Sequence, residues 1–462
     1  MIGTYAAALA VCGASLAFGQ AAIALCGQRR WSWLAPAVGL ALVLAIAWGT
    51  VRLPGDGIVS AVAIAVLLLA SVAYLWGRLE GGAEAWRAGW PVALLALAAA
   101  SLPFAVEGNF GILGTSFNPD MSQHLLAAAR LAEGDGSQLL YQGYPLGPHS
   151  VVVAPNKGLG VGLVQGFSGL TVAVVVLASL TALGAFARLR PMPRTAAALV
   201  VGLAYAVASY FAQGAFKEVI EALFVLAFAL ALRESSRPEW RELPLRFVPA
   251  ALIAVGAVYT YSFPGLLWLI GTAVIWGLAE LLLRKRPNPA FIRSALIAVG
   301  VLVVLVAPEI GRMIDFHKFE TFDPNGPGLG NLFGQVSPFE ALGIWPSGDF
   351  RLAPGDGAVP ALGYYLGVAY ASALLVYGVI RGWRRRELAI LSGLLAVVGV
   401  YALARVAGTP YTAAKSIVIA APVMALVIVL PLLRRPVAVL YLLAAGGCSL
   451  LALANAPVGP TS

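Results

Sequence analysis

The sequence predicts an all-α polytopic membrane protein, and three observations lead to this fold class. Of the 462 residues, 60% are hydrophobic and 11% are charged, whereas a soluble globular domain has about 25% charged residues. Apolar segments of about 20 residues, the length that crosses a bilayer, recur from Ile2 to Ala456. Arginine-rich connections separate them at regular intervals. No stretch is polar enough for a soluble unit, so we expect residues 1–462 to form a single integral membrane domain.

Apolar runs that end at glycine, proline or charged residues predict about thirteen to fourteen transmembrane helices. The segment 261–265, YSFPG, divides two of them, because proline and glycine can end one helix and open the next. The expected ranges are about 2–26, 33–52, 58–77, 91–107, 158–187, 195–213, 216–233, 247–262, 264–284, 292–311, 360–381, 387–406, 414–433 and 436–456.

Basic residues gather in every second connection between these helices, and the short connections in between carry almost none. An error in the number of helices would break this alternation, so the alternation supports the number. The positive-inside rule places the basic connections in the cytoplasm and both termini outside. It also accounts for the net charge of +9 without nucleic acid as a partner.

Two long connections, at about 107–157 and 311–359, are both predicted on the outer side. Long connections inside a compact domain are usually functional. We expect each of them to carry a short amphipathic helix.

The first connection contains NPDMSQHLLAAARLAEG, residues 118–134. Asn118 is a favourable N-cap, Pro119 suits the first helical position, and Gly134 is a natural stop. The helix is too short to cross the bilayer, so we expect it to lie flat at the outer membrane surface. Its apolar stripe comprises Met121, Leu125, Ala128, Leu131 and Ala132.

Asp120 and His124 lie one helical turn apart on the flank of this stripe, where both can face away from lipid. Asp120 can simply complement the helix dipole in the first turn, and His124 can be an interfacial polar residue without a role. These two alternatives stay open on the residues alone.

A resemblance to a known superfamily favours a functional role for the pair. The GT-C glycosyltransferases have an apolar helix, an outer connection that opens with an acid, and a second long outer connection several helices later. The text D-x-x-x-H-L-x-x-x-A-R-L-A-E-G, residues 120–134, resembles the first connection of many bacterial members. The topology over residues 91–462 resembles that of protein O-mannosyltransferases and mycobacterial arabinofuranosyltransferases. Residues 1–90 would be additional N-terminal helices.

The resemblance implies an enzyme that moves a sugar from a polyprenyl-phosphate donor to a cell-envelope glycan or glycolipid. The reaction would take place on the outer face of the bacterial plasma membrane. In these families the matching aspartate acts as the catalytic base or helps to bind the acceptor, and Asp120 is the residue that matches. A phosphate leaving group needs cations rather than a general acid, and one carboxylate can serve as base.

Basic residues at the outer ends of the expected helices are candidates for those cations, although each can instead reach toward lipid headgroups. They are Lys217 beside Glu218, Arg312 and Lys318 at the start of the second long connection, and Arg405 and Lys415 on either side of Tyr411.

Further candidates lie in the two long connections. In YQGYPLGPHS, residues 141–150, turns at the prolines could hold Tyr144 and His149 near Asp120, although His149 can equally be a structural loop residue. His317 lies in the polar segment RMIDFHKFE, which can also be a solvated loop. Glu309, like Glu107, could be a second acid or a metal ligand. No D-x-D pair lies near Asp120, so we expect no cofactor and no catalytic metal, while some members of the superfamily do use a divalent cation.

Three other functions compete with glycosyl transfer. A transporter or flippase of a lipid-linked sugar would need charges near helix midplanes, and here most charges lie at helix ends. An O-antigen-type ligase or polymerase uses a diphosphate donor and an arginine-rich site. A membrane scaffold without chemistry would leave Asp120, Lys217, Arg405 and Lys415 unexplained.

Overall fold

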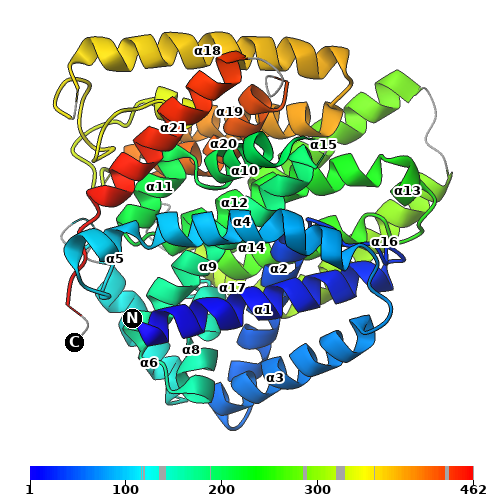
Figure 1. Cartoon of the computed structure of the whole chain (residues 1–462). Coiled ribbons are helices and arrows are strands. Elements are labelled where there is room, and N and C mark those ends of the chain that lie inside the picture. Colours follow the sequence, from blue (N-terminus) through cyan, green and yellow to red (C-terminus); the bar gives the residue numbers. More distant parts are fainter. Residues whose placement is uncertain are drawn as a thin grey trace.

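The computed structural model describes residues 1–115, 117, 120–134, 142–187, 189–284, 289–318, 328–357, 359–431 and 436–460. Within these ranges the chain forms α-helices and short 3-10 turns, and no β-strand is present. Most of the helices are long, apolar and packed side by side (Figure 1). The protein is an all-α polytopic membrane protein.

The first half of the chain contains four long helices, a group of short helices, and a second set of long ones. Their bounds are α1 (Ile2–Leu25), α2 (Ala35–Val51), α3 (Asp56–Leu75), α4 (Gly82–Ala100), α5 (Leu102–Glu107), α6 (Met121–Ala132), α8 (Gly147–Leu159), α9 (Leu163–Leu183), η1 (Gly184–Phe186), α10 (Pro191–Gly202), α11 (Tyr205–Ala212), α12 (Phe216–Ser235) and α13 (Pro238–Arg241).

The second half continues with long helices on either side of the second long connection. Their bounds are α14 (Val248–Tyr261), α15 (Gly265–Arg284), α16 (Pro289–Val306), η2 (Ala307–Glu309), α17 (Ile310–His317), η4 (Pro338–Leu342), α18 (Ala361–Arg384), α19 (Leu388–Ala407), α20 (Pro410–Val429) and α21 (Pro436–Ala454).

Each of the fourteen expected helices has a counterpart, but three expected boundaries are wrong. Helix α4 begins at Gly82 rather than near 91, because Pro91 lies inside the helix and does not open it. The range 158–187 holds two helices, α8 and α9, since Gly160 adopts a left-handed φ of +67° between them. The range 195–213 is also broken, into α10 and α11, which meet at an angle of 54°.

Not every one of these helices is long and apolar enough to cross a membrane. Among the described residues, nine are long and apolar enough, or ten if the bent α10–α11 pair is one span. Helices α2 and α14 are apolar but only 17 and 14 residues long. Helix α12 has 20 residues and begins FKEVIE, so its charged first turns carry polar groups into the bundle.

Both long connections lie at one end of the bundle, together with the two termini (Figure 1). The C-terminal segment pairs with the first connection, where the Gly459 N–H donates to the Ile112 carbonyl over 2.8 Å. The second connection reaches the same place, because Asn331 Nδ2 donates to the Phe117 carbonyl over 2.8 Å. At the opposite end Arg233 makes a two-pronged contact with Glu387, at 2.7 and 2.8 Å. Two of the basic connections therefore meet there, as the alternation predicts.

The N-terminal helices belong to the same packed core as the rest of the chain. Helix α1 packs against α2 and α9, and α2 packs against α14. At the α1–α2 crossing a Cβ on Gly39 would lie 1.6 Å from the Ser15 carbonyl oxygen. Only glycine allows such a close approach of two helix backbones.

Candidate functional site

Helix α6 has an acidic residue at its N-terminus and packs a small apolar face against the bundle. Asp120 is the N-cap residue, one position before the expected first turn, and it is exposed. Asn118 and Pro119 lie outside the described residues. Met121, Ala128 and Leu131 are buried, where α6 packs against α8. The apolar stripe therefore covers neighbouring helices.

His124 and His149 form a buried pair behind this acid. His124 Nδ1 lies 3.1 Å from His149 Nε2, and the Phe216 ring packs against both imidazoles. Helix α8 carries His149, so its expected placement in a loop is wrong. Burial, helped by the nearby Lys217 ammonium, lowers the pKa of His124 to about 3. Burial and His124 likewise hold the pKa of His149 well below its ordinary value, so both rings are neutral.

Lys217, in the first turn of α12, packs on Tyr144. Its Nζ lies 4.0 Å from the centre of the Tyr144 ring and hydrogen bonds with the phenol oxygen of the same residue. Burial raises the pKa of Tyr144 above its usual range, so the phenol stays protonated. Lys217 is thus held by an aromatic side chain of the first long connection.

Lys415, in α20, is held in a similar way from the second half of the chain. Its Nζ lies 3.1 Å from Glu218 Oε1 and 4.3 Å from the centre of the Tyr411 ring. The Tyr261 hydroxyl donates to the same Glu218 oxygen over 3.2 Å. The Lys415 side chain is 17% accessible.

Together these residues form one group, which we call the lysine cluster. Asp120 belongs to it because it acts electrostatically on Lys217, Tyr144 and Tyr411. The cluster combines an exposed carboxylate, a buried carboxylate and two ammonium groups. Its members are Asp120, Tyr144, Lys217, Glu218, Tyr261, Tyr411 and Lys415.

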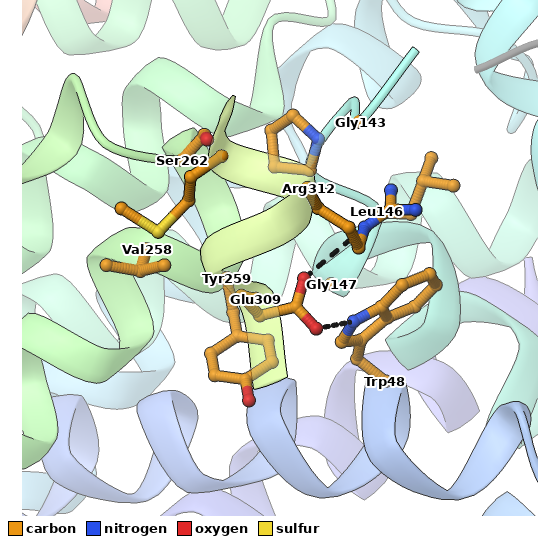
Figure 2. Close-up of a pocket in the computed structure, with 11 residues that line it drawn as sticks. Trp48, Gly143, Leu146, Gly147, Val258, Tyr259, Ser262, Glu309 and Arg312 are labelled. Carbon is orange, nitrogen blue, oxygen red and sulfur yellow. Dashed lines mark hydrogen bonds and ion pairs between the residues drawn. The ribbon is translucent and has the colours of Figure 1, made fainter. Parts of the chain in front are cut away.

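A second group of charges lies behind the first long connection, and we call it the Glu309 clasp (Figure 2). Glu309 Oε1 accepts a hydrogen bond of 2.7 Å from Trp48 Nε1 and lies 3.2 Å from a terminal nitrogen of Arg52. Its Oε2 lies 3.3 Å from Arg312 Nε. Both guanidinium groups also pack on the Trp48 ring. Arg312 in turn donates to the Tyr144 carbonyl over 2.6 Å, so the clasp fixes the backbone of a cluster residue.

The hollow beside the clasp is too small for a sugar or a lipid headgroup. It has room for about one water molecule and is lined by Gly143, Pro145 and Ser262 together with Trp48, Glu309 and Arg312 of the clasp. Glu309 was a candidate second acid or metal ligand, and its oxygens contact two arginines and a tryptophan. These contacts join the end of α2 to η2 and α17.

Two other candidates lie at the surface. His317 is exposed on α17, with its ring 5.7 Å from that of Phe263. Arg405 is exposed at the end of α19, and its guanidinium hydrogen bonds with the Gln335 side-chain oxygen. Phe263 and Gln335, the partners described for these two side chains, do not belong to the lysine cluster.

Sequence reasoning missed several residues that shape the site. Tyr261 was noted only as a helix boundary, although it holds Glu218. Trp48 and Arg52 stand four residues apart at the end of an apolar helix, a spacing that places them on one face. Glu221, one turn after Glu218, is fully buried. No pattern in the sequence around it indicated that it belongs to the site.

Neither a search for metal-binding side chains nor a comparison with known proteins identifies the chemistry of the site. Among the described residues, no three His, Cys, Asp or Glu side chains come together as a metal site. Comparison of the chain with protein-family models, curated proteins and solved structures finds no match.

Proposed function

We propose that the chain is a GT-C-type glycosyltransferase that moves a sugar from a polyprenyl-phosphate donor to a glycan or glycolipid of the cell envelope. The observation that carries this proposal is the convergence of Asp120 with Lys217 and Lys415. These three residues come from separate parts of the chain: Asp120 interacts electrostatically with Lys217 and Tyr411, and Lys415 pairs with Glu218, the residue after Lys217.

The charges of the lysine cluster suit a phosphate leaving group. Lys415 is partly neutralised by Glu218, and Lys217 is held against the ring of Tyr144. A phosphate oxygen near both ammonium groups would gain charge as the bond to the sugar breaks, and preorganised cations stabilise that change. The hydroxyl groups of Tyr144 and Tyr411 lie beside the two lysines and would contact the phosphate or the sugar.

Asp120 acts as the general base in this proposal. The acceptor hydroxyl gives its proton to the carboxylate while its oxygen bonds to the anomeric carbon. The bond from that carbon to the phosphate oxygen breaks, and its electron pair leaves on the polyprenyl phosphate. Neutral His124 and His149 pack behind the site and add no charge that would compete with the lysines.

The proposed location is the outer face of the bacterial plasma membrane. The lysine cluster lies at the end of the bundle that carries both termini, and Arg233 lies at the other end. The positive-inside rule favours the cytoplasm for the arginine-rich end, which leaves the cluster outside.

One observation favours a second function, transport of a lipid-linked sugar. Glu221 is a carboxyl group inside the bundle, and ionisable residues at such positions often mark transport pathways. Its position next to the lysine cluster would suit a site that binds a sugar and moves it.

Release of free polyprenyl phosphate distinguishes the two functions. Purified protein in nanodiscs is mixed with a panel of polyprenyl-phosphate sugars and an envelope glycan extract. The glycosyltransferase proposal predicts release that depends on the extract and on Lys217 and Lys415. Movement of an intact donor across proteoliposomes, without release, would support transport instead.

A further inference from the structure

Glu221 is a fully buried carboxyl group in the described part of the chain. Its side chain has no accessible surface, and neither carboxyl oxygen has a hydrogen-bond partner among the described residues. It lies four residues after Lys217 in α12, about 6 Å further along the helix axis. This carboxyl group therefore lies inside the bundle without a counter-ion among the described residues.

The surroundings of Glu221 come from the helices that pack on α12. Helices α2 and α9 carry no titratable side chain. The other titratable groups near this end of α12 are on α11, α14, α19 and α20, and those that interact electrostatically with Glu221 are Glu218 and Tyr261. The titratable residues on the four helices around the start of α12 are Tyr205, Tyr210, Tyr259, Tyr261, Tyr401, Arg405, Tyr411 and Lys415. Glu280 in α15 and the charged residues of α13 lie toward the opposite end of α12.

An ionised Glu221 would be expensive in this setting. Burial of an unpaired carboxylate is strongly unfavourable because the ion loses its hydration, and Glu218, one turn away on the same face, is already an anion paired with Lys415. The acid form has no net charge and avoids both costs. The surroundings therefore favour a carboxyl group that carries a proton.

A polar connection links this acid to the lysine cluster. Tyr261 interacts with Glu221 and donates to Glu218, and its ring packs edge-on against Trp268. Tyr210 OH and Trp268 Nε1 are also buried without a hydrogen-bond partner among the described residues. Buried polar atoms of this kind are commonly satisfied by ordered water.

We propose that Glu221 is an exchangeable proton-binding site inside the bundle, connected to the lysine cluster through Tyr261 and Glu218. The ligand is a proton rather than a metal cation, because among the described residues no three His, Cys, Asp or Glu side chains come together at the carboxyl group. This proposal does not depend on glycosyl transfer, since the site would bind a proton in an enzyme or a transporter.

The test uses dicyclohexylcarbodiimide, an apolar reagent that reacts with protonated carboxyl groups. The acid oxygen bonds to the carbodiimide carbon, the acid proton moves to a carbodiimide nitrogen, and the adduct rearranges to a stable N-acylurea. Full-length protein in nanodiscs is treated across a series of pH values. Peptide mass spectrometry then gives the labelled fraction at each glutamate.

We expect labelling of Glu221 that is high at acid pH and falls several-fold as the pH rises. Glu309 is buried but bound by arginines, and it should stay unlabelled. Glu218→Gln removes a neighbouring negative charge, so it should move the midpoint of Glu221 labelling to lower pH. The Glu221→Gln variant should lose this adduct, and the wild-type peptide map decides the question even if that variant does not fold.

Glu340 provides an internal control for reagent access. It is buried in η4, and burial raises its pKa well above the ordinary value, so it should also be labelled. Absence of an adduct on Glu221 at every pH, or a labelled fraction that does not change with pH, would overturn the proposal.

Discussion

The ammonium group of Lys415 lies 3.1 Å from the carboxylate of Glu218, although 197 residues separate them in the chain (415 − 218). This pair joins α20 to α12 and places a cation beside Lys217. Because both partners are largely buried, the contact influences stability as well as the charge of the site.

Removal of one partner of this pair should destabilise the fold. Glu218→Gln leaves the Lys415 ammonium without its counter-charge, and loss of one member of a buried pair typically costs about 3 kcal/mol or more. We expect a lower melting temperature in detergent for either Glu218→Gln or Lys415→Met. The double variant should lose less than the sum of the two single changes, and additive losses would show that the pair is not coupled.

The Glu309 clasp should matter more for stability than an exposed ion pair of the same type. Glu309→Gln leaves Arg52 and Arg312 facing each other without an anion, and we expect a loss of about 2 kcal/mol, which allows for the partial exposure of Arg52. Thermal unfolding followed by size-exclusion chromatography measures the change. Glu84→Gln is the matched control, because the Arg30–Glu84 pair is about two-thirds exposed on both sides and should contribute little.

The two histidines should make the fold sensitive to acid. The pKa of His124 is about 3 in the fold against an ordinary value of 6.5, so the unfolded chain binds more protons between these values. Stability is therefore fully present above pH 6.5 and falls as the pH drops toward 3, by up to about 1.4 kcal/mol per pH unit for each buried histidine.

The double variant His124→Asn/His149→Gln keeps polar atoms near the two ring nitrogens but cannot take up a proton. Melting temperatures measured over this pH window should fall less steeply for the variant than for wild type. Equal slopes would mean that other groups govern acid unfolding.

Gly330 should be required for the position of Tyr411. Its φ is +57°, and a Cβ there would lie 2.8 Å from the Tyr411 ring, the ring that holds Lys415. Gly330→Ala should cost about 1–2 kcal/mol from backbone strain alone and should also disturb the lysine cluster. Gly334→Ala, in the same connection, would meet nothing within 4 Å. Melting temperatures that are equal for the two variants would contradict this account of the Tyr411 contact.

The helices could be predicted from the sequence because lipid imposes a length and a composition on each of them. The helix α8 could not, since GPHSVVVAPNKGL contains two prolines and two glycines and has the composition of a turn. Its first residues use Pro148 at a favourable position in the first turn, and the helix is stabilised by packing against α2, α3 and α6. Tertiary contacts here outweigh local preference.

The site could be predicted only in part. Asp120, Lys217 and Lys415 are all recognisable as charges at the ends of apolar segments, but their meeting depends on how α12 packs against α20. The Glu309 clasp shows the limit more clearly. A single glutamate after a proline indicates an acid near a membrane surface, and nothing in the local sequence indicates that Arg52, from the second helix, is its partner.

The most direct test of the central claim compares Asp120→Asn with Glu107→Gln in the polyprenyl-phosphate release assay. Both residues are exposed acids at the same end of the bundle, and only Asp120 belongs to the lysine cluster. If Asp120 is the general base, its variant should lose about 100-fold or more in the rate of sugar transfer and keep its melting temperature, while Glu107→Gln keeps the wild-type rate. Equal rates for wild type and Asp120→Asn would contradict the account.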